Sequence, residues 1–174
     1  SDLGENLLRG VLEDSGLANA FRASEGESNG FADFEPYAPS NNAPASFLAK
    51  SVYDQDGRRI GAVAVQLPID QVNEIMQERA GMGKSGETYL VGADLLMRSD
   101  SYLDPTNHSV EASFANPETG MVDTDAARAA LSGETGADVI IDYNGNPVLS
   151  FYAPLDIYGA RWALIAEIDM DEAF

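Results

Sequence analysis

The sequence lacks several residue types on which common classes of protein depend. It contains no cysteine, so disulfide bonds and thiolate metal sites are excluded. Its single histidine, His108, lies in a polar stretch that predicts an exposed side chain rather than a catalytic base. No apolar run approaches the roughly 18 residues of a membrane-spanning helix, and no signal peptide is visible. The usual hydrolase and metalloprotease motifs do not occur, so neither an enzyme nor a metal or cofactor is expected.

Positive charge is also scarce. Ten Lys and Arg residues against 29 Asp and Glu residues give a net charge of −19 over 174 residues. Such a surface repels nucleic-acid phosphates and anionic lipid headgroups, so neither is an expected partner. The hydrophobic fraction of 44% is ordinary, and it allows a core for one domain or two small ones.

One pattern occurs twice in the chain. Residues 46–70 and 150–171 both begin with Ser-Phe-x-Ala, continue through Asp, Gly and Arg into an apolar run, and end with Gln-Leu or Glu-Ile before an Asp. Each copy predicts a strand, a tight turn, a second strand and the start of a helix. A repeated hairpin that leads into a helix indicates two similar subdomains, which favours a tandem sensor-like module over an enzyme with one central site.

The remaining pattern predicts an α+β chain. In the first half we expect an N-terminal helix within residues 3–22, a strand at 31–37 and, after the first hairpin, a linking helix at 68–79. In the second half we expect strands near 88–92, 96–99, 139–143, 148–154 and 162–168, a polar irregular stretch at 104–118, and a helix at 125–131 capped by Thr124. This order is PAS-like, and the first half shows only its last three strands.

Two further features have competing interpretations. Residues 81–86 match G-x-G-x-x-G and imitate the end of a phosphate-binding loop, but they follow a predicted helix and precede a strand, the reverse of the usual context. A flexible linker is the preferred interpretation. Arg98 follows apolar residues on a predicted strand and either holds an anionic ligand or pairs with a structural carboxylate. The structural pair is favoured because arginine is rarely buried unpaired.

Several stretches resemble the double Cache (dCache) sensor domain. Residues 83–92, which read GKSGETYLVG, and residues 97–101, which read MRSDS, resemble the opening of its membrane-proximal module. Residues 142–169 resemble the closing strands of that module. Residues 31–37 and the first copy of the repeat resemble the end of the membrane-distal module. The resemblance covers most of the chain from about Phe31 onward.

This resemblance implies tandem PAS-like (Cache) modules with antiparallel sheets and flanking helices, the first module being incomplete at its N-terminus. The expected domains are residues 1–80, with the linking helix, and residues 81–174. The implied function is extracytoplasmic, periplasmic sensing of a small molecule by a transmembrane chemotaxis or signal-transduction receptor. The receptor is expected to form a homodimer and to meet the membrane only through helices outside this chain. The alternative is a spacer or dimerisation module that binds no ligand.

Strand alternation and the resemblance together indicate which residues could bind a ligand. Alternation sends Ala62, Ala64 and Gln66 to one face of their strand. Asp33 fits the position of one carboxylate used by amino-acid-binding relatives, whereas Gln66 stands where a second is expected, so half of an ammonium-binding pair is absent. The proposed distal site consists of Asp33, Tyr37, Phe47 and Gln66. A second site is proposed around Tyr89, Arg98, Ser99 and Tyr152.

Overall fold

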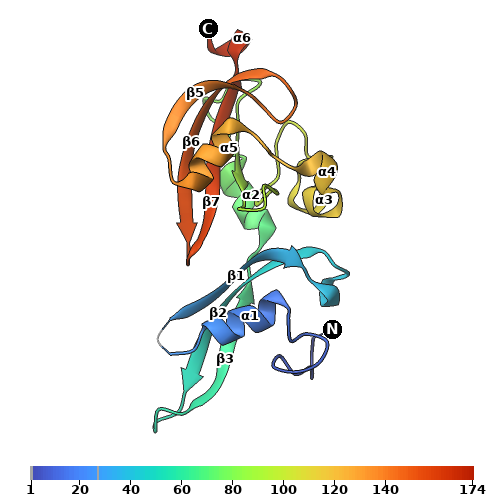
Figure 1. The fold of residues 1–174 in the computed structure, drawn as a ribbon, viewed down its shortest axis with the longest axis vertical. Coiled ribbons are helices and arrows are strands. Elements are labelled where there is room, and N and C mark those ends of the chain that lie inside the picture. Colours follow the sequence, from blue (N-terminus) through green and yellow to red (C-terminus); the bar gives the residue numbers. More distant parts are fainter. Residues whose placement is uncertain (1, 27) are drawn as a thin grey trace. The chain divides into compact units, whose positions relative to one another are not determined.

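The computed structural model describes residues 2–26 and 28–174, which divide into two compact units (Figure 1). The first unit comprises the described residues up to 67 together with residues 158–160, and the second comprises residues 68–157 and 161–174. Each unit contains one antiparallel sheet.

The first unit is a three-stranded sheet with a helix on one face. Its elements are α1 (Gly16–Ala23), β1 (Asn29–Pro36), the 3-10 helix η1 (Ala38–Ser40), β2 (Pro44–Tyr53) and β3 (Arg59–Gln66). The strands lie in the order β1-β2-β3, and α1 packs on β1 and β2 (Figure 1). The core beneath α1 consists of Leu12, Ala20, Tyr37, Ala45, Phe47 and Ala49.

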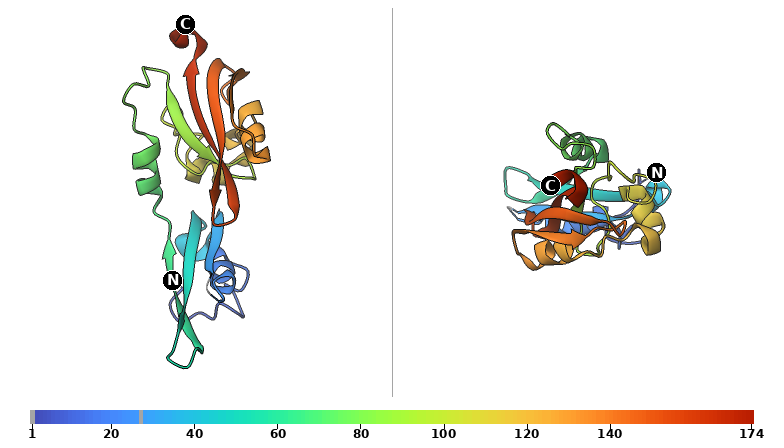
Figure 2. Two further views of the ribbon diagram at one scale, coloured as in Figure 1. Left: turned by 90° about the vertical axis from the view of Figure 1, so that its left-hand side faces the viewer. Right: turned by 90° about the horizontal axis from the view of Figure 1, so that it is seen from above.

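The second unit is a four-stranded sheet whose first strand lies beside its last. Its elements are α2 (Ile69–Met76), β4 (Glu87–Val91), α3 (Val110–Ala115), α4 (Pro117–Gly120), α5 (Asp125–Ser132), β5 (Gly136–Ile141), β6 (Pro147–Ile157), β7 (Ala160–Asp169) and α6 (Met170–Ala173). The strand order is β4-β7-β6-β5, and α5 packs on β5 and β6. Figure 2 shows α2 beside β4, where the Thr88 hydroxyl donates to the Met76 carbonyl at 2.7 Å.

The predicted repeat is confirmed as a repeated arrangement of elements. Both α1-β1-β2-β3-α2 and α5-β5-β6-β7-α6 run helix, strand, hairpin and helix. The predicted cap of α5 is also confirmed, since the Thr124 hydroxyl accepts from the Ala127 amide at 3.2 Å and Gly133 ends the helix with a φ of 101°.

The expectation of a helix within residues 3–22 is largely wrong. Helix α1 begins only at Gly16, after the Ser15 hydroxyl accepts from the Ala18 amide at 3.3 Å. Before it the chain forms turns, with Gly4 and Gly10 at φ values of 86° and 98°. These left-handed conformations cannot continue a right-handed helix.

The expected strand at 96–99 and the expected irregular stretch at 104–118 also need correction. Within the described residues, 96–99 contribute only an isolated bridge from Met97 to Val91, because the Ser99 hydroxyl accepts from the Leu90 amide at 2.9 Å. The stretch 104–118 includes the short helices α3 and α4, the first capped by Ser109. None of the helices described is both long and apolar enough to cross a membrane.

The close approach of α1 to β1 makes a prediction about Gly30. A Cβ atom there would lie 1.9 Å from the Ala20 carbonyl oxygen, whereas a Cβ at Gly61 on β3 would meet nothing within 4 Å. We expect Gly30→Ala to lower the free energy of unfolding by about 2 kcal/mol or more, because the helix must move away from the sheet. Gly61→Ala is the matched control and is expected to change it by less than about 0.5 kcal/mol. Urea unfolding monitored by fluorescence measures both, and equal effects would contradict the packing described.

Candidate functional site

Two of the four candidates in the first unit lie in its core. Tyr37 and Phe47 are 3% and 5% exposed, and their rings meet edge to face at 4.9 Å. The Tyr37 hydroxyl donates to the Asp2 carboxylate at 3.0 Å. Burial, reinforced by Asp2, raises the pKa of Tyr37 to about 12. These two aromatic side chains therefore form an apolar floor beneath α1.

The other two candidates remain accessible. Gln66 is exposed and is the cross-strand partner of Phe47, so the two side chains share one face of the sheet. Asp33 is half-buried at the irregularity in β1, where its carboxylate accepts from the Phe34 amide at 2.7 Å. Phe47 thus links Tyr37 with Gln66, while Asp33 lies on the neighbouring strand.

Arg98, a candidate of the second unit, forms the structural pair that the sequence favoured. Its guanidinium lies 3.0 Å from the Asp94 carboxylate and donates to the Leu96 carbonyl at 3.1 Å. It also lies against Gly92, where a Cβ would meet the guanidinium carbon at 2.1 Å. Only 2% of Arg98 is exposed, so the side chain is built into the fold.

The remaining candidates of the second unit also make contacts within the fold. Ser99 is fully buried and holds the Leu90 amide, as described above. Tyr152 is half-buried over Gly136, its cross-strand partner on β5. Tyr89 is fully buried and donates to the carboxylate of Glu167 at 2.7 Å. The structure therefore does not join these residues into one open pocket but connects Tyr89 to a larger polar network.

Sequence reasoning missed the two glutamates at the centre of this network. Glu87 on β4 and Glu167 on β7 are direct cross-strand partners, and they are 3% and 4% exposed. The missed signal was their alternation with apolar neighbours, in Glu87-x-Tyr89 and in Ile165-x-Glu167, which places both carboxylates on the inner face. Like charges directly opposite each other destabilise a sheet, so the two carboxylates must differ in environment.

Glu87 has a full set of hydrogen-bond donors. One of its oxygens accepts from the Tyr143 hydroxyl. The other accepts from the Ser101 hydroxyl at 2.8 Å and from the amides of Tyr102 and Leu103 at 3.0 and 3.2 Å. Such an array suits a buried carboxylate anion.

Glu167 has fewer hydrogen-bond donors than Glu87. One oxygen accepts from Tyr89, while the other is buried and completes no hydrogen bond with the residues described. Burial raises the pKa of Glu167 to about 7, and the charges of Asp142 and Glu87 add to the rise, against the opposing effect of the Tyr89 and Ser150 hydroxyls. Glu167 therefore exchanges its proton near neutral pH.

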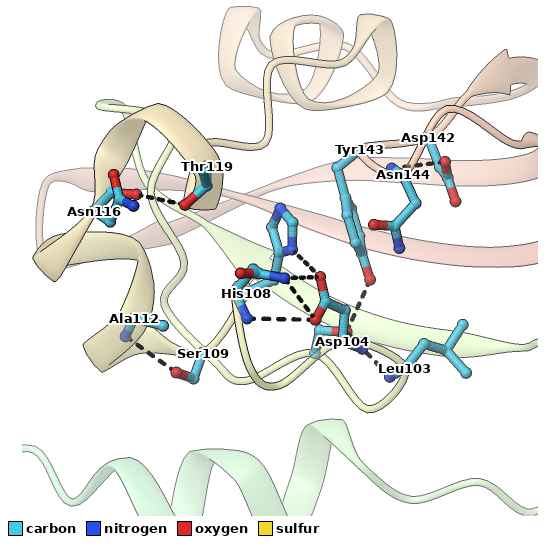
Figure 3. A network of polar contacts seen from close by, with 12 residues as sticks. Leu103, Asp104, His108, Ser109, Ala112, Asn116, Thr119, Asp142, Tyr143 and Asn144 are labelled. Atoms are coloured by element: carbon cyan, nitrogen blue, oxygen red, sulfur yellow. Dashed lines mark hydrogen bonds and ion pairs between the residues drawn. The ribbon is translucent and has the colours of Figure 1, made fainter.

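The prediction that His108 is exposed is wrong. The side chain is 4% exposed, and its Nδ1 atom lies 2.9 Å from the Asp104 carboxylate (Figure 3). Its ring also packs against the Tyr143 ring at 4.1 Å. Although burial opposes it, hydrogen bonds from Asn107 and His108 hold the pKa of Asp104 below its usual range. The signal was the spacing of Asp104 and His108, four residues apart.

The second unit also carries an apolar groove of about 290 Å³. It lies between the loop that follows α2 and the strands β5, β6 and β7, and it is lined by Gly81, Met82, Gly86, Ala137, Leu149, Phe151, Ala166, Glu167 and Ile168. Residues 2–26 and 28–174 include no group of three or more His, Asp or Glu side chains that could hold a metal ion.

A comparison with protein-family models identifies the kind of domain. The dCache_1 model of the Cache domain matches residues 12–174. A search of curated proteins by sequence finds no match.

Solved structures share this fold. The periplasmic sensory domain of the Campylobacter jejuni chemoreceptor Tlp1 aligns with a TM-score of 0.62 and 14% identity, over 95% of this chain and 56% of that one. The ligand-binding domain of the Pseudomonas fluorescens chemoreceptor CtaA, in complex with L-alanine, aligns with a TM-score of 0.56 and 15% identity, over 100% of this chain and 65% of that one. The ligand-binding domain of the Pseudomonas aeruginosa amino acid chemoreceptor PctB, in complex with L-Arg, aligns with a TM-score of 0.52 and 18% identity, over 90% of this chain and 61% of that one. This chain therefore spans between 56% and 65% of their lengths, and at such identities the likeness establishes the fold alone.

The environment of Glu167 predicts how stability depends on pH. Its pKa of about 7 in the folded protein lies above the ordinary value of 4.5, so the stability that comes from the protonated form is complete below pH 4.5 and is lost as the pH rises through 7. We expect this group to lower the free energy of unfolding by up to about 3 kcal/mol between about pH 5 and 8.5. Glu167→Gln, which is neutral throughout, should lack this decline, while Glu74→Gln on the exposed side of α2 should retain it. Urea unfolding across the pH range measures the difference, and identical profiles for wild type and Glu167→Gln would refute the assignment.

Proposed function

The chain belongs to the Cache domain family, and from this membership we propose that it is the extracytoplasmic, small-molecule-sensing part of a transmembrane receptor. In this proposal residues 1–80 belong to a membrane-distal module and residues 81–174 form a membrane-proximal module of a periplasmic chemotaxis or signal-transduction receptor. The duplicated arrangement of helix, strand, hairpin and helix is the observation that carries the proposal. The domain binds its ligand without transforming it.

The two copies differ at the position where a ligand would bind. Glu167 stands three residues before α6, and Gln66 stands three residues before α2. In the second unit β4 covers the edge of β7 and contributes Glu87 to the interior. Among the described residues no strand pairs with the outer edge of β3, and Ala64 and Gln66 are exposed on its inner face. One copy is therefore filled by its own side chains and the other is open.

The ligand site is assigned to the open copy. Of the four residues proposed from the sequence, Gln66 supplies an amide that both donates and accepts hydrogen bonds, and Asp33 supplies a carboxylate. Tyr37 and Phe47 are buried in the core, where they support the sheet behind the site. Because the chain spans under two thirds of its structural relatives, the proposal includes a further part of the receptor that pairs with β3 and closes the site. Amino acids are the first ligands to test, since relatives were crystallised with them.

Signal transmission follows from the order of the elements. A ligand acts only through its different affinities for two conformations of the receptor. Gln66 is followed directly by Leu67, Pro68 and helix α2, so a displacement of the end of β3 is passed along the chain into α2. Helix α2 and the chain end at Phe174 are the proposed transmitting elements, within a homodimeric receptor.

A spacer or dimerisation role is the second candidate function. It is favoured for the second unit, where Tyr89, Arg98 and Ser99 use their polar groups on the protein itself. If the first unit is closed by its own side chains in the same way, no ligand site is left.

A thermal-shift screen distinguishes the two candidates. It uses a panel of amino acids, carboxylates, amines and purines against this chain and against a version extended upstream. A ligand at one hundred times its Kd is expected to stabilise the protein by about 2.7 kcal/mol. Asp33→Ala and Gln66→Ala should each weaken binding about tenfold, because each removes a hydrogen-bonding group from the site. Gln55→Ala, in the exposed β2–β3 turn, should not.

The outcomes are separable. A response from the extended version alone means that the site needs the additional chain. A response that both site variants leave unchanged refutes the placement in the first unit. No response from either version favours the spacer.

A further inference from the structure

The glycine-rich loop at residues 81–86 has no part in the proposed ligand site. It connects α2 with β4, and Gly81 and Gly83 adopt left-handed φ values of 84° and 66°. In this conformation the amides of Lys84 and Ser85 donate at 2.8 Å each to the two carboxylate oxygens of Glu172 in α6. The Ser85 hydroxyl donates to the same carboxylate at 2.6 Å.

We infer that this loop is an anion-binding nest occupied by the protein's own Glu172 carboxylate, and that the pair forms a latch holding α6 to the loop that follows α2. Successive backbone amides in such a loop form a concave site for an anion. The resemblance to a phosphate-binding loop therefore reflects a shared physical property, although the bound anion is a side chain of the same chain.

The fit of the carboxylate into the loop is close. A Cβ atom at Gly83 would lie 2.3 Å from a Glu172 carboxylate oxygen, so a side chain there would displace the carboxylate, and the left-handed φ also favours glycine. The Ser85 hydroxyl also accepts from the Asp169 amide at 3.2 Å, just before α6 begins. Ser85 thus holds α6 at both of its ends.

Electrostatics favour the internal anion over an external one. The Ser85 hydroxyl, followed by the Lys84 and Ser85 amides, lowers the pKa of Glu172 to about 2, so the carboxylate is charged at any physiological pH. An external anion must approach a chain with a net charge of −19, whereas Glu172 is tethered beside the loop.

The loop is also fixed from the side of α2. The Arg79 guanidinium donates to the Gly83 and Lys84 carbonyls at 3.1 and 2.8 Å and lies 3.8 Å from the Tyr102 ring centre. Contacts therefore run from the end of α2 through the loop to α6, which Figure 2 shows at the same end of the second sheet as the loop. The role of this latch in signalling rests on the proposed function, but the latch itself does not.

Amide hydrogen exchange followed by NMR tests the latch directly. Glu172→Gln should reduce the protection of the Lys84 and Ser85 amides about tenfold or more, while the amides of β4 and β7 keep theirs. Asp171→Asn changes the adjacent exposed carboxylate and serves as the matched control, with protection unchanged. Ser85→Ala should give a smaller loss, because it removes one of three donors. Unchanged protection in Glu172→Gln overturns the inference.

The receptor that contains this domain tests the coupling. There, Glu172→Gln should leave ligand affinity within about twofold of wild type but lower the ligand-driven output about fivefold or more. An unchanged output, in a protein whose loop amides have lost protection, overturns the coupling role. If the wild-type receptor itself binds no ligand, the proposed function fails, and the exchange measurement still decides whether the latch exists.

Discussion

The second unit is organised around the buried carboxylate of Glu87. Because its donors come from residues 101–103 and from Tyr143, this one side chain ties β4 to the loop that follows it and to the turn before β6. A buried carboxylate is tolerated only with donors of this kind. The carboxylate of its partner Glu167 accepts from the Tyr89 hydroxyl, and burial, which the Tyr89 and Ser150 hydroxyls only partly offset, raises the pKa of Glu167 to about 7. The interior therefore holds one carboxylate with several hydrogen-bond donors and a second one whose pKa is raised by burial.

The duplication has the opposite outcome in the two units. In both units a helix covers a hairpin, and the last strand of the hairpin leads into a second helix. The residue three positions before this second helix lies on the inner face of its sheet. In the second unit this residue is Glu167, enclosed by β4, and in the first it is Gln66, exposed at the edge of β3. The same arrangement of elements therefore gives a filled core in the second unit and an open face in the first. In the proposed function the open face accepts the ligand and the filled core relays the displacement.

Elements that depend on local chemistry were predictable from the sequence. The hairpin at Asn144-Gly145 and the ends of α5 follow from turn and cap residues only a few positions apart. The spacing of Asp104 and His108 indicates their contact, but the packing of His108 against Tyr143, which is distant in the sequence, has no local signal. The role of the aromatic candidates Tyr37 and Phe47 was also ambiguous in the sequence. An inward-facing aromatic residue looks alike in a core and in a ligand site, and only the packing of α1 shows that these two belong to a core.

The shortage of lysine and arginine explains how several carboxylates of this chain are held. With 10 cationic residues for 29 acidic ones, most carboxylates cannot be held by an ion pair. Backbone amides take that role instead: those of Tyr102 and Leu103 hold Glu87, and those of Lys84 and Ser85 hold Glu172. A similar pair of amides, those of Asn144 and Asn146, holds Asp142 in the β5–β6 turn. Asp54 in the β2–β3 turn combines both kinds of contact, since it accepts from the amides of Asp56 and Arg58 and also pairs with the Arg58 guanidinium. The positions of amide donors are fixed by the backbone, so each such carboxylate binds only when its loop has the right conformation, and it restrains that conformation. In this acidic chain, loop geometry and carboxylate position are therefore coupled at Glu87 and at Glu172.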